Sequence, residues 1–285
     1  MTVLDLEERR RLPLLAEELR KLPAFLRRDV LTAWSYRSAF VSDWIALLLG
    51  ILVFYFIGRL VDPATLPSYG GTRSGYMAYV TIGFALGGFV VLALSRVATA
   101  IQREQLMGTL ESVLLTPTAP ATVQIGSVVY DLLYIPIRTG LFLFVVAVAF
   151  GLDFQLAGAP AALLFLLAFI PFVWGIGIVT AAVVLTFRRG SGAANFGVTL
   201  LTLASGAFFP LTLLPHWLTG VAEHNPMAVT VEAIRKALLG GAGLGSLGGD
   251  LLLVLPFAAA SLAAGVLAFR AALGREQRRG TLGLY

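Results

Sequence analysis

Six stretches of the chain are almost continuously apolar and separated by polar segments. Each is long enough for a membrane-spanning helix, which needs about 20 mostly apolar residues. The six stretches are residues 41–60, 76–95, 125–150, 161–187, 194–214 and 251–273. The pattern predicts an all-α integral membrane protein whose six transmembrane helices form one domain over residues 41–273.

The segment before the first apolar run, residues 1–40, has a different pattern. Leu26, Val30, Ala33 and Trp34 recur at helical spacing within it, and most of the nearby charges lie elsewhere around the helix. This arrangement is typical of an amphipathic helix lying at the membrane surface with a Trp anchor. A solvated helix is the alternative. Residues 274–285 form a short basic tail.

Composition supports a membrane protein. Hydrophobic residues make up 58% of the 285 residues and charged residues 13%, with a mean hydropathy of +0.86. A soluble domain has about 45–50% apolar and about 25% charged residues, so a soluble enzyme or a nucleic-acid-binding module is excluded. The chain has no cysteine, and its two histidines, His216 and His224, are expected to be interfacial polar residues rather than metal ligands.

The charges also predict an orientation. With six spans, one side of the membrane holds both terminal segments and the segments 96–124 and 188–193. Together with Arg270 at the end of the last run, that side contains 16 of the 21 Lys and Arg residues. The opposite side contains four. The positive-inside rule therefore predicts a multi-pass protein of the cell inner (plasma) membrane with both termini in the cytosol.

The cytosolic loop between the second and third runs has helical periodicity. An apolar stripe contains Leu106, Leu110, Val113 and Leu114, and an opposite stripe with two carboxylates contains Glu104, Gly108, Glu111 and Leu115. Pro117 disfavours helix at the residue before it and so ends the pattern. The spacing fits either a plain surface helix or a helix over residues 102–116 that docks into a partner.

Two blocks of sequence resemble one known family. The stretch from Glu104 to Glu111, with Gly108 and Thr109 inside it and Leu115 and Pro117 after it, resembles the coupling helix of type-2 ATP-binding-cassette (ABC) exporter permeases. Residues 208–241 resemble the extracellular block of the same family, and its matching positions are Pro210, Pro215, Trp217, Asn225, Pro226, Glu232 and Arg235.

This resemblance implies several expectations. The permease would pair with a second copy or a close homologue, and two cytosolic ATPase subunits would bind its coupling residues, which are Glu104, Gly108, Thr109, Glu111, Leu115 and Pro117. The block 208–241 would form re-entrant helices between spans five and six. Its residues Pro210, Pro215, Trp217, Asn225, Pro226 and Arg235 would close the pathway on the outside.

No catalytic site is expected on this chain. A phosphate-binding P-loop needs Gly-Lys followed by Ser or Thr, whereas the two lysines, Lys21 and Lys236, each follow arginine. We therefore expect no cofactor and no metal on this chain, and ATP and Mg²⁺ on the partner subunit. Membrane lipids are a further expected partner, and nucleic acid is not.

Polar and small residues inside the apolar runs are candidate contact positions. Asp131 and Arg138 lie two helical turns apart on one face of the third run. They fit either a polar pair in the pathway or an interfacial contact. Candidates for the pathway or the dimer interface are Tyr79, Gly83 and Gly87 in the second run and Asn195, Thr199 and Thr202 in the fifth.

The sequence thus predicts the permease subunit of an ABC exporter with an amphiphilic cargo such as a drug, a lipid or a lipid-linked glycan. The alternatives are an ATP-independent channel or secondary transporter, and a membrane scaffold. The scarcity of ionisable residues within the runs and the lack of an internal repeat weigh against the secondary transporter.

Overall fold

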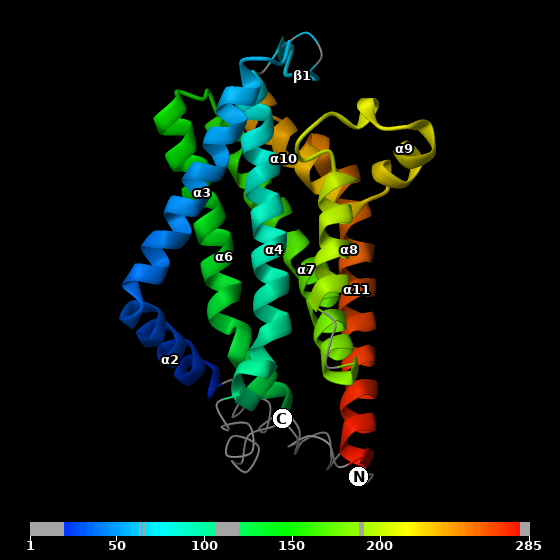
Figure 1. The fold of residues 1–285 in the computed structure, drawn as a ribbon. Helices are drawn as coiled ribbons and strands as arrows, with labels where there is room; N and C mark the ends of the chain where they lie inside the picture. The colour runs from blue at the N-terminus through cyan, green and yellow to red at the C-terminus, as the bar shows by residue number, and fades with distance from the viewer. Residues whose placement is uncertain are drawn as a thin grey trace, which may run out of the picture.

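The computed structural model describes residues 20–62, 64, 66–73, 75–106, 120–187 and 191–279. Those residues form a bundle of long helices (Figure 1). The helices are α2 (Leu22–Ser35), α3 (Arg37–Gly58), α4 (Tyr76–Leu106), α6 (Pro120–Phe150), α7 (Ala159–Phe187), α8 (Ser191–Leu203), α9 (His216–Glu223), α10 (Pro226–Gly240) and α11 (Leu244–Arg279). The fold also has a small hairpin of two strands with two residues each, β1 (Ser68–Tyr69) and β2 (Thr72–Arg73). Two short 3₁₀ turns are η2 (Leu156–Gly158) and η3 (Leu211–Leu213).

Five helical segments in the described part of the chain are long and apolar enough to cross a membrane. They are Phe40–Gly58, Tyr76–Arg96, Val129–Phe150, Leu156–Val183 and Leu244–Ala272. These segments confirm the prediction of an all-helical, multi-pass membrane protein and correspond to five of the six predicted runs.

The fifth predicted run, residues 194–214, is not one long helix. It consists of α8, which has 13 residues, followed by a turn and η3. A helix of that length is about 20 Å long, less than the bilayer core of about 30 Å. The helix ends before Gly206, whose φ of +67° is left-handed, and Pro210 follows. The predicted six-span arrangement is therefore not confirmed.

The helix α4 is the centre of the bundle, with α3 and α6 on one side and α7, α8 and α11 on the other in Figure 1. Its span is the most buried of the five, whereas the span of α3 is the least buried. The main core joins α4 to α7 and α10 through residues such as Phe89, Phe169 and Val231. Residues on α4 are therefore placed to contact several other helices.

The helices α7 and α11 lie unusually close together. A Cβ atom added at Gly175 of α7 would overlap the backbone of Ser261 in α11, and one added at Gly265 of α11 would lie 2.6 Å from the Gly175 carbonyl oxygen. Small residues allow such close approach between membrane helices, where dispersion contacts replace the hydrophobic effect. The backbones of these two helices are therefore in direct contact at one side of the bundle.

The helix α2 lies obliquely below α3 (Figure 1) and is separated from it by a break at Tyr36. Phe25 of α2 packs over Gly126 of α6, where a Cβ atom would lie 2.6 Å from the ring. Val30 and Trp34, two members of the predicted apolar stripe, are exposed. The predicted amphipathic helix before the first run is thus α2, which has an exposed apolar face and is separated by one residue from the start of α3.

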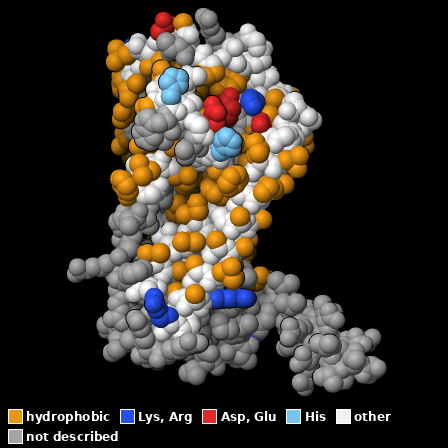
Figure 2. Space-filling model, turned by 90° about the vertical axis from the view of Figure 1, so that its right-hand side faces the viewer, with side chains coloured by type: hydrophobic (Ala, Val, Ile, Leu, Met, Phe, Trp, Pro, Cys, Tyr) orange, Lys and Arg blue, Asp and Glu red, His pale blue; other side chains and the backbone are white. Residues whose placement is uncertain are grey.

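On the face of the molecule shown in Figure 2, hydrophobic side chains cover the middle, and the charged side chains lie toward the two ends. Figure 2 shows orange side chains over the middle of the molecule, basic side chains near the lower end, and acidic, basic and histidine side chains near the upper end. A bilayer favours this distribution, since its apolar core excludes charges that its two surfaces accept.

Candidate functional site

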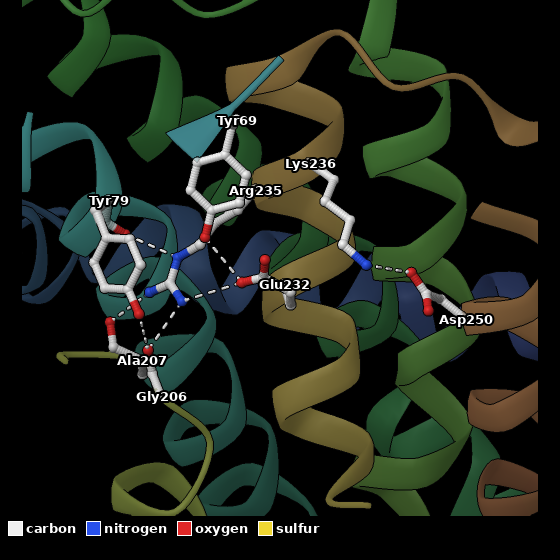
Figure 3. Close-up of polar contacts among 8 residues, drawn as sticks. All are labelled: Tyr69, Tyr79, Gly206, Ala207, Glu232, Arg235, Lys236 and Asp250. Atoms are coloured by element: carbon white, nitrogen blue, oxygen red, sulfur yellow. Dashed lines mark hydrogen bonds and ion pairs between the residues drawn. The ribbon is translucent and has the colours of Figure 1, made fainter. Parts of the chain in front are cut away.

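Arg235 is the centre of a buried polar cluster at the upper end of the bundle (Figure 3). It lies on α10, and only 1% of its surface is exposed. Its guanidinium donates three hydrogen bonds to backbone oxygens: Nε to Tyr79 at 3.2 Å, Nη1 to Gly206 at 2.9 Å and Nη2 to Ala207 at 2.9 Å. One side chain therefore joins α10 to α4 and to the turn after α8.

Tyr79 holds the guanidinium from a second direction. The Arg235 Cζ atom lies 3.4 Å from the centre of the Tyr79 ring, a cation–π contact. The Tyr79 hydroxyl donates to the Gly206 oxygen at 3.1 Å, so the same carbonyl accepts from both side chains. We call Tyr79, Gly83, Gly206, Ala207 and Arg235 the outer junction, after the side on which the charge pattern predicts them to lie.

Gly83 allows the turn after α8 to lie directly on α4. A Cβ atom at this position would overlap the carbonyl group of Ala207. One turn further along α4, a Cβ atom at Gly87 would lie 3.2 Å from the Thr202 methyl group. The structure thus brings Tyr79, Gly83, Gly87 and Thr202, four of the predicted pathway or dimer-interface residues, to one contact within the chain.

Asn225 and Pro226 set the start of α10. The Asn225 side chain accepts from the Met227 N–H at 3.0 Å, an N-cap that satisfies a free donor of the helix. Its amide nitrogen donates to the Leu201 oxygen of α8 at 3.1 Å. Pro226 occupies the first helical position, which suits its fixed φ. These predicted outer residues position α10, and with it Arg235.

The remaining predicted outer residues surround α9. Pro210 is buried directly before η3, and Pro215 is exposed directly before α9. Trp217 lies in α9, and its side chain is outside the described part. In α8, Thr199 is exposed, and the side chain of Asn195 is also outside the described part.

Beside the outer junction, Glu232 of the predicted outer block has a partner, Tyr69, that the sequence did not predict. The Tyr69 hydroxyl of β1 donates to Glu232 Oε2 at 2.9 Å, and Arg235 Nη1 lies 3.9 Å from the same oxygen. Burial, followed by the charge of Glu232, raises the pKa of the Tyr69 phenol far above its usual value, so the hydroxyl remains a donor. The Gly70-Gly71 pair is typical of a hairpin turn, and it could have predicted the hairpin that carries Tyr69.

Two ion pairs join helices at the lower end of the bundle. Arg138 Nη2 of α6 lies 2.7 Å from Asp43 Oδ2 of α3, and Arg96 Nε of α4 lies 3.8 Å from Asp131 Oδ1 of α6. Asp131 and Arg138, predicted on one face of the third run, therefore have partners on different helices. Their partners Asp43 and Arg96 were not predicted.

The predicted coupling residues lie at the edge of what the structure describes. Glu104 is in the last turn of α4, and its side chain is outside the described part. Gly108, Thr109, Glu111, Leu115 and Pro117 lie outside the described residues. Their proposed role thus depends on sequence resemblance and on the direction of α4.

Comparison with known proteins assigns the chain to a family. The family model described as ABC-2 type transporter matches residues 20–239. The chain is also 28% identical over 202 residues to the linearmycin resistance permease protein LnrN of Bacillus subtilis (strain 168); the match covers 70% of this chain and 51% of that protein. This chain therefore spans about half the length of the curated relative that it matches.

The matched family consists of membrane permeases that lack the ATPase domain, so a permease of this kind generally requires an ATPase partner. This agrees with the predicted absence of ATP hydrolysis on the chain. With the family model matching more than half of its residues, the protein belongs to the ABC-2 type transporter family.

Proposed function

We propose that this chain is the transmembrane subunit of an ABC exporter, in which two copies form the substrate pathway and two separate ATPase subunits drive it. The family match over residues 20–239 carries this proposal. The geometry of α4 supports it, since this single helix extends from the outer junction to the segment that resembles a coupling helix.

The length of α4 suits the transmission of movement. Its apolar span covers Tyr76–Arg96, and the helix continues without a break to Leu106. The ten residues after Arg96 add about 15 Å of helix beyond the span. In the proposed mechanism, ATP closes the two ATPase subunits and moves residues 102–116, and α4 transmits that displacement toward Tyr79 and Gly83.

The proposal includes the sixth crossing. In it, α8 and the following residues 204–214 together span the membrane, although α8 alone is too short. The block 208–241 then dips into the outer leaflet and returns, and its residues close the pathway externally. The buried bonds of Arg235 support a closing role, because they tie α10 to both α4 and the end of α8.

The orientation in the proposal follows the charges, with both termini in the cytosol and the outer junction on the external side. The cargo is an amphiphilic compound that enters from the membrane or the cytosol. The name of the Bacillus relative associates that protein with resistance to linearmycin, which favours efflux of a toxic compound among the amphiphilic cargo classes.

Purification of the tagged, full-length chain from its native cells tests the proposal. A P-loop ATPase should co-purify, and the Glu111→Lys variant should lose much of the ATPase and of the coupled transport, because the reversed charge would oppose docking. Glu276→Lys makes the same change near the end of α11 and serves as the control. An ATP-independent channel or secondary transporter would instead purify without an ATPase and transport normally as Glu111→Lys.

A further inference from the structure

A pocket of about 330 Å³ lies beside the outer junction, where the hairpin, α10 and α11 meet. Its walls include Tyr69 and Gly70 of the hairpin, Glu232 and Lys236 of α10, and Leu247 of α11. The pocket thus combines an acid, a base, a phenol and an apolar side chain from three separate elements.

Two glycines fix one wall of this pocket. Gly70 has a left-handed φ of +58°, and a Cβ atom on it would lie 2.9 Å from the Gly240 oxygen. Gly240, at the end of α10, would likewise have a Cβ atom 3.0 Å from the Gly70 nitrogen. Because neither residue has a side chain, the hairpin lies directly on α10, and Tyr69 is held against Glu232.

The two charges of the pocket lie one helical turn apart and are held by different partners. Glu232 accepts the Tyr69 hydroxyl on Oε2, and the dashed contacts in Figure 3 converge on this one oxygen. Lys236 Nζ lies 3.0 Å from Asp250 Oδ2 of α11. Both side chains stay accessible, with 38% of Glu232 and 42% of Lys236 exposed.

Each charge has bonding capacity left for a ligand. A carboxylate has two oxygens with about four acceptor sites, and an ammonium has three donors. A ligand that offers an ammonium to Glu232 and an anion to Lys236 would make two charge-assisted hydrogen bonds, which are stronger than neutral ones. The nearby N-terminus of α11, which starts at Leu244, adds a favourable field for the anion.

The surroundings of the pocket indicate where the ligand comes from. The apolar span of α11 begins at Leu244, beside the pocket. Leu244, Leu252 and Leu253 are exposed along that helix, as expected for side chains in contact with acyl chains. The pocket is therefore at headgroup level, and its assignment to the outer leaflet rests on the orientation proposed above.

We propose that this pocket binds the zwitterionic headgroup of an outer-leaflet phospholipid, with the primary ammonium on Glu232 and the phosphate on Lys236. Phosphatidylethanolamine has this headgroup, and phosphatidylglycerol has the phosphate without the ammonium. A lipid bound here would hold the hairpin, α10 and α11 together next to the outer junction.

Native mass spectrometry of the purified, full-length permease tests this site. The protein is taken from vesicles with equal amounts of phosphatidylethanolamine and phosphatidylglycerol, and the retained lipids are measured. The wild type should prefer phosphatidylethanolamine by about tenfold, the size expected for one charge-assisted hydrogen bond. Glu232→Gln should abolish the preference, whereas Lys236→Gln should lower the retention of both lipids.

Glu223→Gln is the matched control, since Glu223 is an exposed acid of α9 outside the pocket. It should keep the wild-type preference. Equal retention of the two lipids by the wild type would overturn the proposal. A preference that survives in Glu232→Gln would also overturn it, because the ammonium would then be bound elsewhere. The retained-lipid ratio is measured on folded protein, so a loss of yield in one variant does not obscure the result.

A last arm identifies the source of the headgroup. Soluble phosphoethanolamine is added to the lipid-loaded wild type. If the lipid is not displaced, the ligand is a membrane lipid that is held also by its acyl chains. If the lipid is displaced and the displacement depends on Glu232, the pocket recognises the same headgroup in a free, soluble zwitterion. None of these measurements requires the ATPase, so failure of the lipid site and failure of the exporter assignment remain distinguishable.

Discussion

The two ends of the bundle are joined by opposite kinds of polar contact. At the outer junction, Arg235 donates to three backbone oxygens and is almost completely buried. At the lower end of the bundle, called the inner end here because the charge pattern predicts that it faces the cytosol, side-chain charges pair with side-chain charges across helices. One partner of each pair is partly exposed: Asp43 by 46% and Arg96 by 33%.

This difference separates a helix contact that allows one relative position from a contact that allows several. A guanidinium bonded to backbone oxygens is satisfied only when the turn after α8, α4 and α10 keep one relative position. An ion pair between an arginine and an aspartate tolerates small shifts, because the long arginine side chain can change rotamer and water can solvate the exposed partner. In the proposed mechanism, small movements would therefore begin at the inner end, and the outer end would change only as a unit.

The largest effect is expected from Gly83→Ala. The new methyl group would overlap the Ala207 carbonyl, so the turn after α8 must move and the bonds of Arg235 must break. We expect loss of folded protein, measured as yield and thermal midpoint in detergent. Gly88→Ala, on the same helix, would place its methyl group 3.9 Å from Leu47. This control should be neutral or slightly stabilising, since alanine favours helix.

The next largest effect is expected from Arg235→Lys. A lysine keeps the charge but cannot reach three oxygens in a plane, and each buried carbonyl left unpaired costs about 1–3 kcal/mol. We expect a loss of about 3 kcal/mol in unfolding free energy, seen as a lower thermal midpoint. Arg59→Lys is the control, because Arg59 also lies over a tyrosine ring, Tyr55, but is exposed. Equal effects of the two changes would contradict a special role for the outer junction.

Much of the fold could be predicted from the sequence, because long apolar runs are determined by the thickness of a bilayer. The run at 194–214 was the exception, since glycine and proline are compatible with a membrane helix and the sequence does not show that α8 stops at Leu203. The continuation of α4 to Leu106 was predicted only as a separate loop helix.

The candidate site was predictable in part. The resemblance of the outer block selected Arg235, but its partners are backbone oxygens of Tyr79, Gly206 and Ala207, and backbone groups have no sequence signal. The spacing of Asp131 and Arg138 placed them on one helix face, which says nothing about charges on neighbouring helices. Their partners Asp43 and Arg96 depend on how three helices pack.

A charge exchange tests whether the inner end is adjustable. Asp43→Arg alone places two positive charges together, and Arg138→Asp alone places two negative charges together. Each single change should lower the unfolding free energy by about 2 kcal/mol, the size of a charged hydrogen bond. The double variant Asp43→Arg with Arg138→Asp should recover most of the loss in thermal midpoint and in ATP-driven transport. If it recovered neither, the pair would be as dependent on exact geometry as the outer junction.

The smallest effect is expected from Asp131→Asn. The Arg96 to Asp131 distance of 3.8 Å is long for a hydrogen bond. Asp131 is buried but Arg96 is one-third exposed, so water around the guanidinium weakens the attraction, and we expect the pair to contribute about 1 kcal/mol or less. Asparagine also keeps the shape and hydrogen-bonding capacity of the side chain. The thermal midpoint should therefore change little, and the wild-type value should fall slightly toward that of the variant as salt is raised. A loss as large as that of Arg235→Lys would mean that α4 and α6 are fixed together at the inner end, and the contrast between the two ends would then fail.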